Sequence, residues 1–235
     1  MLFDNLHALL QGGDLRTARA VYRKIRSQMA PEWLANLYGD CIAVEIGLTR
    51  ISESPVNLYR VSAQVILLGD TEDKPVGTVR KGLYAPHTLS YEDGEAIEVG
   101  VGEIADALDV AAARGGALYD SLRREGEVEP MSSGWLHLGQ IELLPAYRGL
   151  GISHYVMKEI VAALGSNAVV TLQPFPLGTD LTPTQTDAAA AALEEHWVRF
   201  GVKNVSIAHD GSRMLWFDMA CVNHGSLLTY EGALP

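Results

Sequence analysis

The chain has 235 residues, 48% of them hydrophobic, and its 29 acidic residues outnumber 18 lysines and arginines to give a formal net charge of -11. A chain of this length and hydrophobic content can form one large domain, or one domain with an appendage. The acidic balance argues against a general nucleic-acid binder, because phosphate contacts require a basic surface, and no apolar run approaches the roughly 18 residues of a membrane span.

The first predicted element is a helix that begins after Asp14, a favoured N-cap residue, and ends before Pro31. Its apolar residues recur at helical spacing: Leu15, Ala18, Tyr22, Ile25 and Met29. We therefore expect an N-terminal helical element over residues 1–35 and a main domain over residues 36–235.

Three strand-like runs follow, at residues 41–51, 59–69 and 74–84, and turn-forming clusters separate them. Their order predicts an antiparallel meander. An alanine-rich helical stretch at 103–124 lies within a helical insertion over about residues 86–133. Gly115 and Gly116 are expected to break or kink that helix.

Strands and helices alternate in the second half of the main domain. A strand at 135–144 leads through a glycine-containing turn into a helix that reaches Leu164, and a short buried-type strand follows at 168–172. The last helix runs from Asp187 to Phe200 and ends at Gly201, before a terminal hairpin. The pattern as a whole predicts an α+β fold with a twisted mixed sheet flanked by helices.

The N-terminal residues and the cysteines favour a cytoplasmic protein. MLFDNLHALL has no basic segment ahead of its apolar residues, so we expect no export signal. Cys41 and Cys221 are far apart in strand-like sequence, which suits buried reduced thiols. The seven histidines are scattered, and their spacing predicts no metal site.

The turn after the strand at 135–144 has the features of an anion site. The first amides of a helix have no partner within it, and the helix dipole adds partial positive charge there. Arg148 adds a full charge, and Gly149 and Gly151 remove side chains that would keep a phosphate away. We expect the turn to bind an anionic group, most readily a diphosphate; a plain turn beside a surface arginine is the simpler alternative.

The segment LLPAYRGLGIS, residues 143–153, resembles the acetyl-CoA signature of the GNAT superfamily of N-acetyltransferases. Arg148, Gly151 and Ser153 occupy the signature positions, with serine where glycine or alanine is usual. The later segment HWVRFGV is similar to another family segment, with Trp197 where tyrosine is common, and the terminal hairpin fits the family's last strands. The resemblance covers about residues 134–220 and implies a GNAT-like sheet.

The resemblance also implies a cofactor site and an activity. Backbone amides of Gly149, Leu150, Gly151, Ile152 and Ser153 would bind the diphosphate of coenzyme A, beside Arg148. The main chains of Leu143 and Leu144 would pair with the pantetheine arm like an added strand, and their amides would polarise the thioester. The expected activity is acetyl transfer from acetyl-CoA to a primary amine of a small molecule or a protein, in a monomer or a homodimer.

Two residues compete as the base that such a transfer requires, because free amines are mostly protonated at neutral pH. His137 has a suitable ordinary pKa. Glu142 lies nearer the turn, and partial burial would raise its pKa into range. Strand alternation places them on opposite faces. Each also has a purely structural interpretation, as a hydrogen-bonded core histidine and as a solvated glutamate.

Several features depart from the family pattern or suggest another site. Trp197 is too weak an acid to protonate a thiolate, and His196, one residue away along the helix, is expected to face elsewhere. A catalytically inactive CoA-binding module is therefore the alternative function. Gly100, Gly102 and Ala105 match a dinucleotide-binding spacing, with Glu103 unfavourably placed. The acidic stretch at 91–130 is either a solvated surface or an attractor of a cationic substrate.

Overall fold

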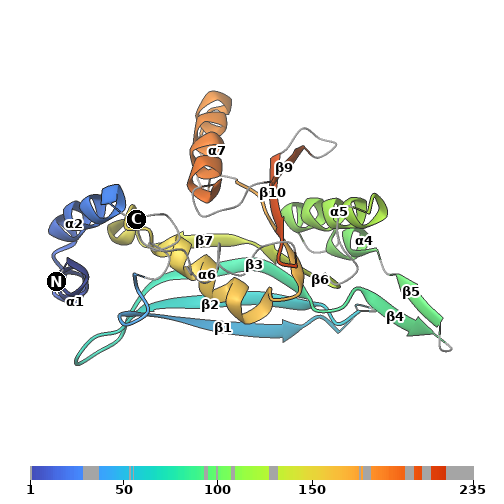
Figure 1. The fold of residues 1–235 in the computed structure, drawn as a ribbon, viewed down its shortest axis with the longest axis horizontal. Coiled ribbons are helices and arrows are strands. Elements are labelled where there is room, and N and C mark those ends of the chain that lie inside the picture. Colours follow the sequence, from blue (N-terminus) through green and yellow to red (C-terminus); the bar gives the residue numbers. More distant parts are fainter. Residues whose placement is uncertain are drawn as a thin grey trace.

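The computed structural model has an α+β fold built on one mixed sheet (Figure 1), as the sequence predicts. It describes residues 2–28, 37–52, 54, 56–92, 95–98, 100–106, 109–126, 132–174, 176, 181–198, 204–207 and 213–220. The eight-stranded sheet has the order β1-β2-β3-β6-β8-β10-β9, and β7 pairs with β3 beside this path. Strands β6 and β8 are parallel; the other pairs are antiparallel.

The predicted meander is confirmed as β1 (Ile42–Arg50), β2 (Tyr59–Leu67) and β3 (Lys74–Ala85). A separate two-stranded sheet follows, formed by β4 (Leu89–Glu92) and β5 (Glu95–Glu98). Cys41, just before β1, is a buried free thiol whose pKa burial raises to about 12. The thiol is therefore protonated and unreactive, whereas Cys221 lies outside the described residues.

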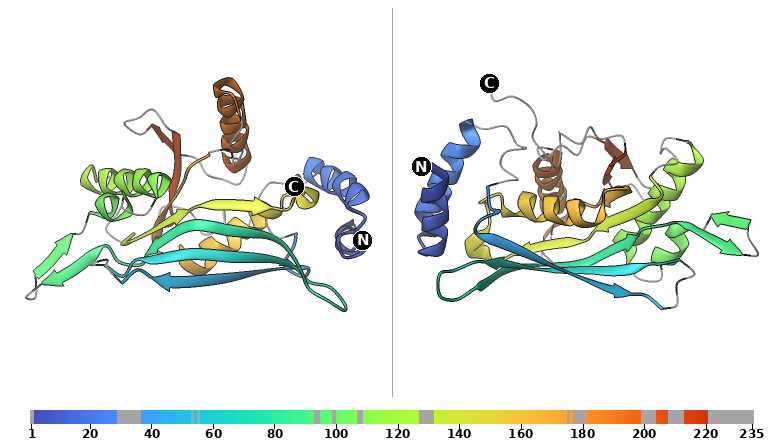
Figure 2. Two further views of the ribbon diagram at one scale, coloured as in Figure 1. Left: turned by 180° about the vertical axis from the view of Figure 1, so that it is seen from behind. Right: turned by 60° about the horizontal axis from the view of Figure 1, so that its bottom comes forward.

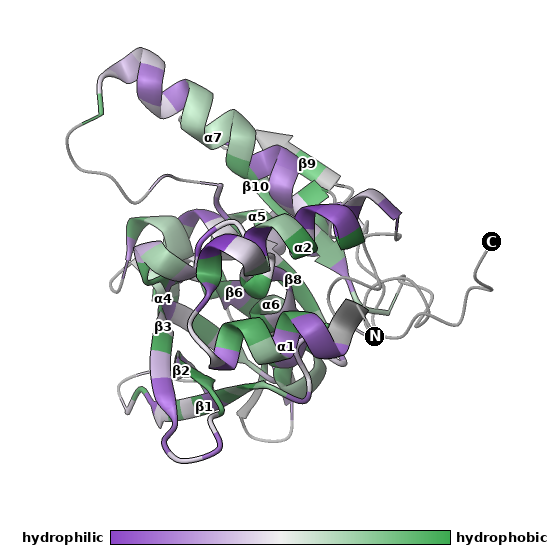
Figure 3. Cartoon of the chain, turned by 90° about the vertical axis from the view of Figure 1, so that its left-hand side faces the viewer, coloured by the Kyte–Doolittle hydropathy of each residue, from purple (hydrophilic) through white to green (hydrophobic). Residues whose placement is uncertain are grey.

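Two helices, α1 (Leu2–Gln11) and α2 (Leu15–Gln28), form the N-terminal element. The second is the predicted one: the carboxylate of Asp14 accepts a hydrogen bond from the Thr17 amide at 3.1 Å. Helix α2 alternates hydrophilic and hydrophobic segments (Figure 3), and Ala18, Tyr22 and Ile25 lie in the same hydrophobic core as the sheet. The element thus shares its core with the main domain; the boundary expected at residue 35 lies outside the described residues.

The expected helix break at Gly115 and Gly116 is wrong, because α5 (Val110–Arg124) runs through both glycines. The interruption comes earlier, between α4 (Val101–Asp106) and the N-cap Asp109. Both glycines serve close packing. A Cβ at Gly115 would lie 2.7 Å from Thr171 Oγ1 and 2.8 Å from His137 Nδ1, and one at Gly116 would lie 3.0 Å from the backbone of Gly102.

Replacing Gly115 by alanine is expected to destabilise the protein. In an ordinary helix interior this change stabilises by roughly 0.5–1 kcal/mol. Here the new methyl group collides with Thr171 and His137, which are both buried, so we expect a net loss of about 1–3 kcal/mol. Urea unfolding of Gly115→Ala measures the sign directly, and a gain in stability would contradict the packing described.

The expected strand at 135–144 is two strands, β6 (Gly134–Leu138) and β7 (Gln140–Leu143). A 3-10 turn (Pro145–Tyr147) leads to α6 (Ile152–Leu164), which crosses over to β8 (Ala168–Leu172). Helix α7 (Pro183–Val198) begins four residues earlier than expected, and its expected stop at Gly201 lies outside the described residues. Strands β9 (Asn204–Ile207) and β10 (Arg213–Asp218) form the predicted terminal pair.

Helices cover both faces of the sheet. Leu136 and Leu138 of β6 belong to the core that includes α6, whereas Trp135 belongs to a second core with α4 and α5. Because side chains alternate along a strand, α6 and the α4–α5 pair lie on opposite faces. Helices α1 and α2 lie at one end of the sheet and the β4–β5 hairpin at the other, as Figure 1 and the two views of Figure 2 show.

Strand alternation breaks at Gly139. Ile141 and Leu143 pack with the α6 core, although His137, an even number of residues away, faces α5. A bulge in β3 accompanies the break: Val61 pairs with Gly82 but Ala63 pairs with Val79, and Lys81 has a φ of 59°. The expectation of one continuous alternation is therefore wrong, and His137 and Glu142 share a face of the sheet.

In the described part of the chain, no helix combines the length and apolar character needed to cross a membrane.

Candidate functional site

A cavity of about 840 Å³ lies where β7 separates from β8. Its walls come from the ends of β6 and β7, from the start of α5, from the glycine turn and from α7. Strand β6 stays paired with β8 up to Leu138 and Leu172, whereas β7 pairs only with β3 among the described residues. The volume is typical of a small-molecule or cofactor site.

Two glycines of the turn have a left-handed backbone conformation. Gly149 and Gly151 have φ values of 75° and 78°, in the left-handed region that favours glycine. Gly149 lines the cavity, and nothing lies within 4 Å of where its Cβ would be. Gly151 is the N-cap of α6, and no described side chain caps it. The His154 amide donates to the Gly151 carbonyl at 3.0 Å, so the amides of Ile152 and Ser153 remain for an anion, and Ser153 lines the cavity.

The space beside Gly151 is filled by the N-terminal helix rather than left open. A Cβ on Gly151 would lie 2.1 Å from the hydroxyl oxygen of Tyr22. The guanidinium of Arg19 donates hydrogen bonds to the carbonyl oxygens of Arg148, at 3.2 Å, and of Ala146. Helix α2 therefore supports the turn from behind, a role that its amphipathic pattern gave no means of predicting.

Two leucine amides of β7 were expected to polarise the thioester, and the structure leaves one of them available for that contact. The Leu144 amide donates to the Val76 carbonyl at 2.9 Å, so it is part of the sheet and is not available to a thioester. In an antiparallel pair, alternate residues face alternate sides, so the amides of Ile141 and Leu143 point away from β3. The Leu143 carbonyl accepts from Arg148 Nε at 2.9 Å. The backbone at Leu143 thus faces the cavity, and the expectation for Leu144 is corrected.

His137 lines the cavity and is only 2% exposed. Its Nδ1 lies 3.2 Å from Thr171 Oγ1, which also accepts a hydrogen bond from Trp135 Nε1 at 3.0 Å. Burial lowers the pKa of His137 to about 4, although the negative charge of Asp109 opposes this shift. The imidazole is therefore neutral at neutral pH and can accept a proton, but it is a weak base.

Glu142 is exposed on the surface of β7 and does not line the cavity. The structure consequently brings His137, Leu143, Arg148, Gly149 and Ser153 together around one cavity. The other predicted site residues do not line it: Glu142, Leu144, Leu150, Gly151 and Ile152.

His196 and Trp197 both line the cavity, so the expectation that His196 faces elsewhere is wrong. Adjacent residues of α7 border the same wide opening even though their side chains diverge by about 100°. His196 Nε2 lies 2.9 Å from Ser153 Oγ, and its ring stacks on His154 with centroids 3.9 Å apart. Burial, assisted by Arg26, lowers the pKa of His196 to about 4.

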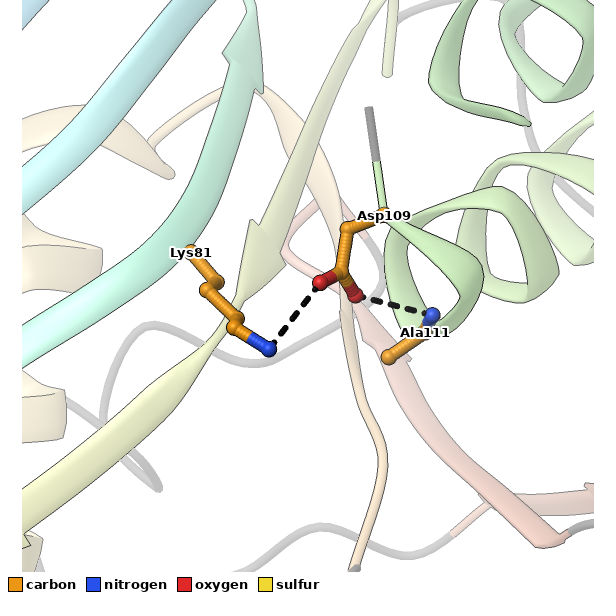
Figure 4. Close-up of polar contacts among 3 residues, drawn as sticks. All are labelled: Lys81, Asp109 and Ala111. Carbon is orange, nitrogen blue, oxygen red and sulfur yellow. Dashed lines mark hydrogen bonds and ion pairs between the residues drawn. The ribbon is translucent and has the colours of Figure 1, made fainter. Parts of the chain in front are cut away.

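An ion pair that sequence reasoning missed lies at the other end of the cavity. Lys81 Nζ is 3.2 Å from Asp109 Oδ2, and Asp109 also caps α5 by accepting from the Ala111 amide at 2.9 Å (Figure 4). Burial alone would raise the pKa of Asp109, but the Ala111 amide and the Lys81 ammonium lower it. An aspartate before an alanine-rich helix was the available signal, but the helix was expected to start at residue 103.

The dinucleotide-like spacing at Gly100, Gly102 and Ala105 does not form a phosphate site. The carboxylate of Asp120 accepts hydrogen bonds from the amides of Val101, at 3.0 Å, and Gly102, at 2.7 Å. These are the amides that a diphosphate would need, and an internal carboxylate occupies them.

Comparison with known proteins gives no matching family model, no matching curated protein and no matching solved structure.

Proposed function

We propose that this protein is an acetyl-CoA-dependent N-acetyltransferase with a GNAT-like sheet. One observation carries the proposal: the cavity joins the outward-facing backbone of β7 to the uncapped N-terminus of α6. The first suits an extended amide-containing chain, and the second suits a diphosphate. Coenzyme A combines both in one molecule. The meander, the parallel pair β6–β8 and the crossover helix α6 between these strands support the same assignment.

In this proposal the diphosphate binds the amides from Gly149 to Ser153. Arg148 supplies positive charge beside them; its Nε is engaged by Leu143, and a guanidinium has five N–H donors in total. The pantetheine arm runs along β7, where the Leu143 amide polarises the thioester carbonyl. Leu144 takes no part in this contact, since its amide bonds to Val76.

The reaction forms a carbon–nitrogen and a sulfur–hydrogen bond and breaks a carbon–sulfur and a nitrogen–hydrogen bond. The neutral amine nitrogen bonds to the acetyl carbon, the carbon–sulfur bond breaks, and coenzyme A leaves as a thiol; the ammonium form of the acceptor loses one further proton to solvent. Of the two expected bases, His137 lines the cavity and Glu142 does not, so the proposal assigns the role of proton acceptor to His137. Because its pKa is about 4, the rate follows ionisation of the amine and rises with pH through neutrality.

The alternative, a CoA-binding module without catalysis, draws on the same cavity. It is favoured by the low pKa values of both cavity histidines, about 4 each, which make them weak bases and leave no charged imidazolium to protonate a thiolate at pH 7. The two functions share the cofactor and differ in turnover.

Thioester consumption by the purified chain with a panel of primary amines distinguishes them. We expect release of free thiol only when an amine is present, at a rate that rises from pH 6 to pH 9. Cofactor binding without thiol release from any amine would favour the inactive module.

Arg148→Met tests the cofactor end of the site. Loss of a charged contact to the diphosphate is expected to weaken coenzyme A binding by about tenfold or more. Arg60→Met, which removes an exposed arginine from β2 outside the cavity, is the matched control and should leave the affinity unchanged. Equal affinities for both variants would show that Arg148 does not contact the cofactor.

A further inference from the structure

The cavity is basic although the chain is acidic. Among the described residues that line it, Lys81, Arg114 and Arg148 carry positive charge and Asp109 alone carries negative charge. The chain as a whole has a formal net charge of -11. Such a local reversal of sign concentrates anions at the opening. It also disfavours the idea that the acidic stretch at 91–130 gathers a cationic substrate, since its one described cavity-lining acid is paired with Lys81.

These charges lie at two distinct ends. Arg148 belongs to the glycine turn, whereas Lys81 and Arg114 lie with Asp109 beside His137, at the start of α5. The diphosphate proposed above accounts for Arg148. It leaves the two basic residues at the other end without an assigned role, at the place where an acceptor amine would approach the thioester.

The backbone conformation at Lys81 directs its side chain toward the end of the cavity beside His137 and Asp109. Lys81 has a φ of 59°, which is costly for a residue with a Cβ, and it lies in the β3 bulge. Across the sheet Gly139 provides the space: a Cβ there would lie 2.1 Å from the Arg80 carbonyl oxygen. Strain of this kind persists where the surroundings impose it, and it is common at functional sites.

Asp109 holds the Lys81 ammonium in place and leaves some of its N–H donors unused. An ammonium has three N–H donors, and Asp109 is its one ion-pair partner within the described part of the chain. The Lys81 side chain remains 53% exposed, at the opening of the cavity. Figure 4 shows the lysine extended from β3 toward the carboxylate that caps α5. The remaining donors are available to an anionic group of a bound molecule.

We propose that this end of the cavity recognises a carboxylate on the acceptor, so that the substrate is an amino acid or another amine with a nearby carboxylate. Lys81 binds the carboxylate, Asp109 positions Lys81, and Arg114 adds positive charge to the cavity wall. The inference rests on the proposed acetyl transfer for its reaction, but the anion site itself does not require that reaction. A simple monoamine or a polyamine lacks the recognised group.

The test compares L-amino acids with their primary carboxamides as acceptors. Each pair shares the side chain and differs in the charge of one group. Because the amine of the carboxamide is the weaker base, KM is expressed as the concentration of the neutral amine. We expect the carboxylate member of each favoured pair to have a KM about tenfold or more below that of its carboxamide. Lys81→Met should raise the KM for the carboxylate member by a similar factor, with little change in kcat, and leave the carboxamide unaffected.

The chain offers a matched control in the ion pair of Arg213 and Glu194. It is 2.6 Å long, with side chains 53% and 19% exposed against 53% and 23% for Lys81 and Asp109, and it does not line the cavity. Arg213→Met should leave both KM values unchanged. Methionine and lysine are both unbranched at Cβ, so Lys81→Met adds no backbone strain; Lys81→Arg, which keeps the charge, should restore most of the preference.

Calorimetric titration separates failure of this inference from failure of the proposed function. Coenzyme A and an amino acid are titrated separately into the wild-type chain and into Lys81→Met. Amino acid binding that is lost in Lys81→Met supports the anion site even if no acetyl transfer occurs. Coenzyme A binding and amine acetylation without a carboxylate preference, or with equal effects of Lys81→Met on both members of a pair, would overturn the inference and leave the function intact.

Discussion

Gly151→Ala is expected to destabilise the protein and to weaken coenzyme A binding more than any other single change in the turn. The φ of 78° alone makes alanine cost about 1–2 kcal/mol. The added methyl group would also lie 2.1 Å from the Tyr22 hydroxyl and 2.6 Å from the ring carbon that carries it. Helix α2 must move away, and the turn loses the support that Arg19 and Tyr22 give it. We expect a total loss of about 3 kcal/mol or more.

Gly149→Ala is the matched control for this prediction. Its φ of 75° imposes the same backbone strain, but nothing lies within 4 Å of the new Cβ. Urea unfolding of both variants therefore isolates the contact with α2. The double variant Gly151→Ala with Tyr22→Ala should lose much less stability than the two single changes added together, because Tyr22→Ala removes the ring with which the new methyl group collides. Equal destabilisation by Gly149→Ala and Gly151→Ala would contradict the packing of α2 on the turn.

Stability is expected to fall steeply between pH 6.5 and pH 4. Burial lowers the pKa of His137 to about 4 and the pKa of His196 to about 4. Burial also lowers the pKa of His154 to about 3, and the charges of His196 and Arg26 add to that shift. A free histidine titrates near 6.5. Between these values the unfolded chain binds more protons than the folded one, so acid favours unfolding. Each buried histidine contributes a slope of about 1.4 kcal/mol per pH unit.

His154→Gln tests this slope. Glutamine keeps a donor for the His196 carbonyl, which lies 2.9 Å from His154 Nε2, but it does not titrate. The free energy of unfolding should then depend less steeply on pH between 6 and 4.5, by about 1.4 kcal/mol per pH unit. The same slope for the variant and the wild type would show that His154 is not buried in its neutral form.

Local patterns in the sequence were sufficient to predict much of the fold. The helical spacing after Asp14, the three alternating runs of the meander and the strand, turn and helix around Arg148 each follow from contacts within a few residues. The α+β class follows from their order. Two glycines near Arg148 indicated a turn at this point, and the structure has one there, with positive φ at both glycines.

The remaining features depend on contacts between distant parts of the chain. Gly115 and Gly116 were expected to break a helix because propensity takes no account of what packs on it; here Thr171 and Gly102 require their small size. The bulge at Lys81 arises from pairing between strands, so the change of face at Gly139 was not foreseen. Tyr22 lies against Gly151 although 129 positions separate them in the sequence, and no local pattern predicts that contact.

The central claim is that the turn from Gly149 to Ser153 binds the diphosphate of coenzyme A. Calorimetric titration of the wild-type chain with coenzyme A, and separately with pantetheine, which lacks the diphosphate and the nucleoside, tests it most directly. We expect saturable binding of coenzyme A, near one molecule per chain, and far weaker binding of pantetheine. Absence of saturable heat with coenzyme A, or equal affinity for the two molecules, would contradict it.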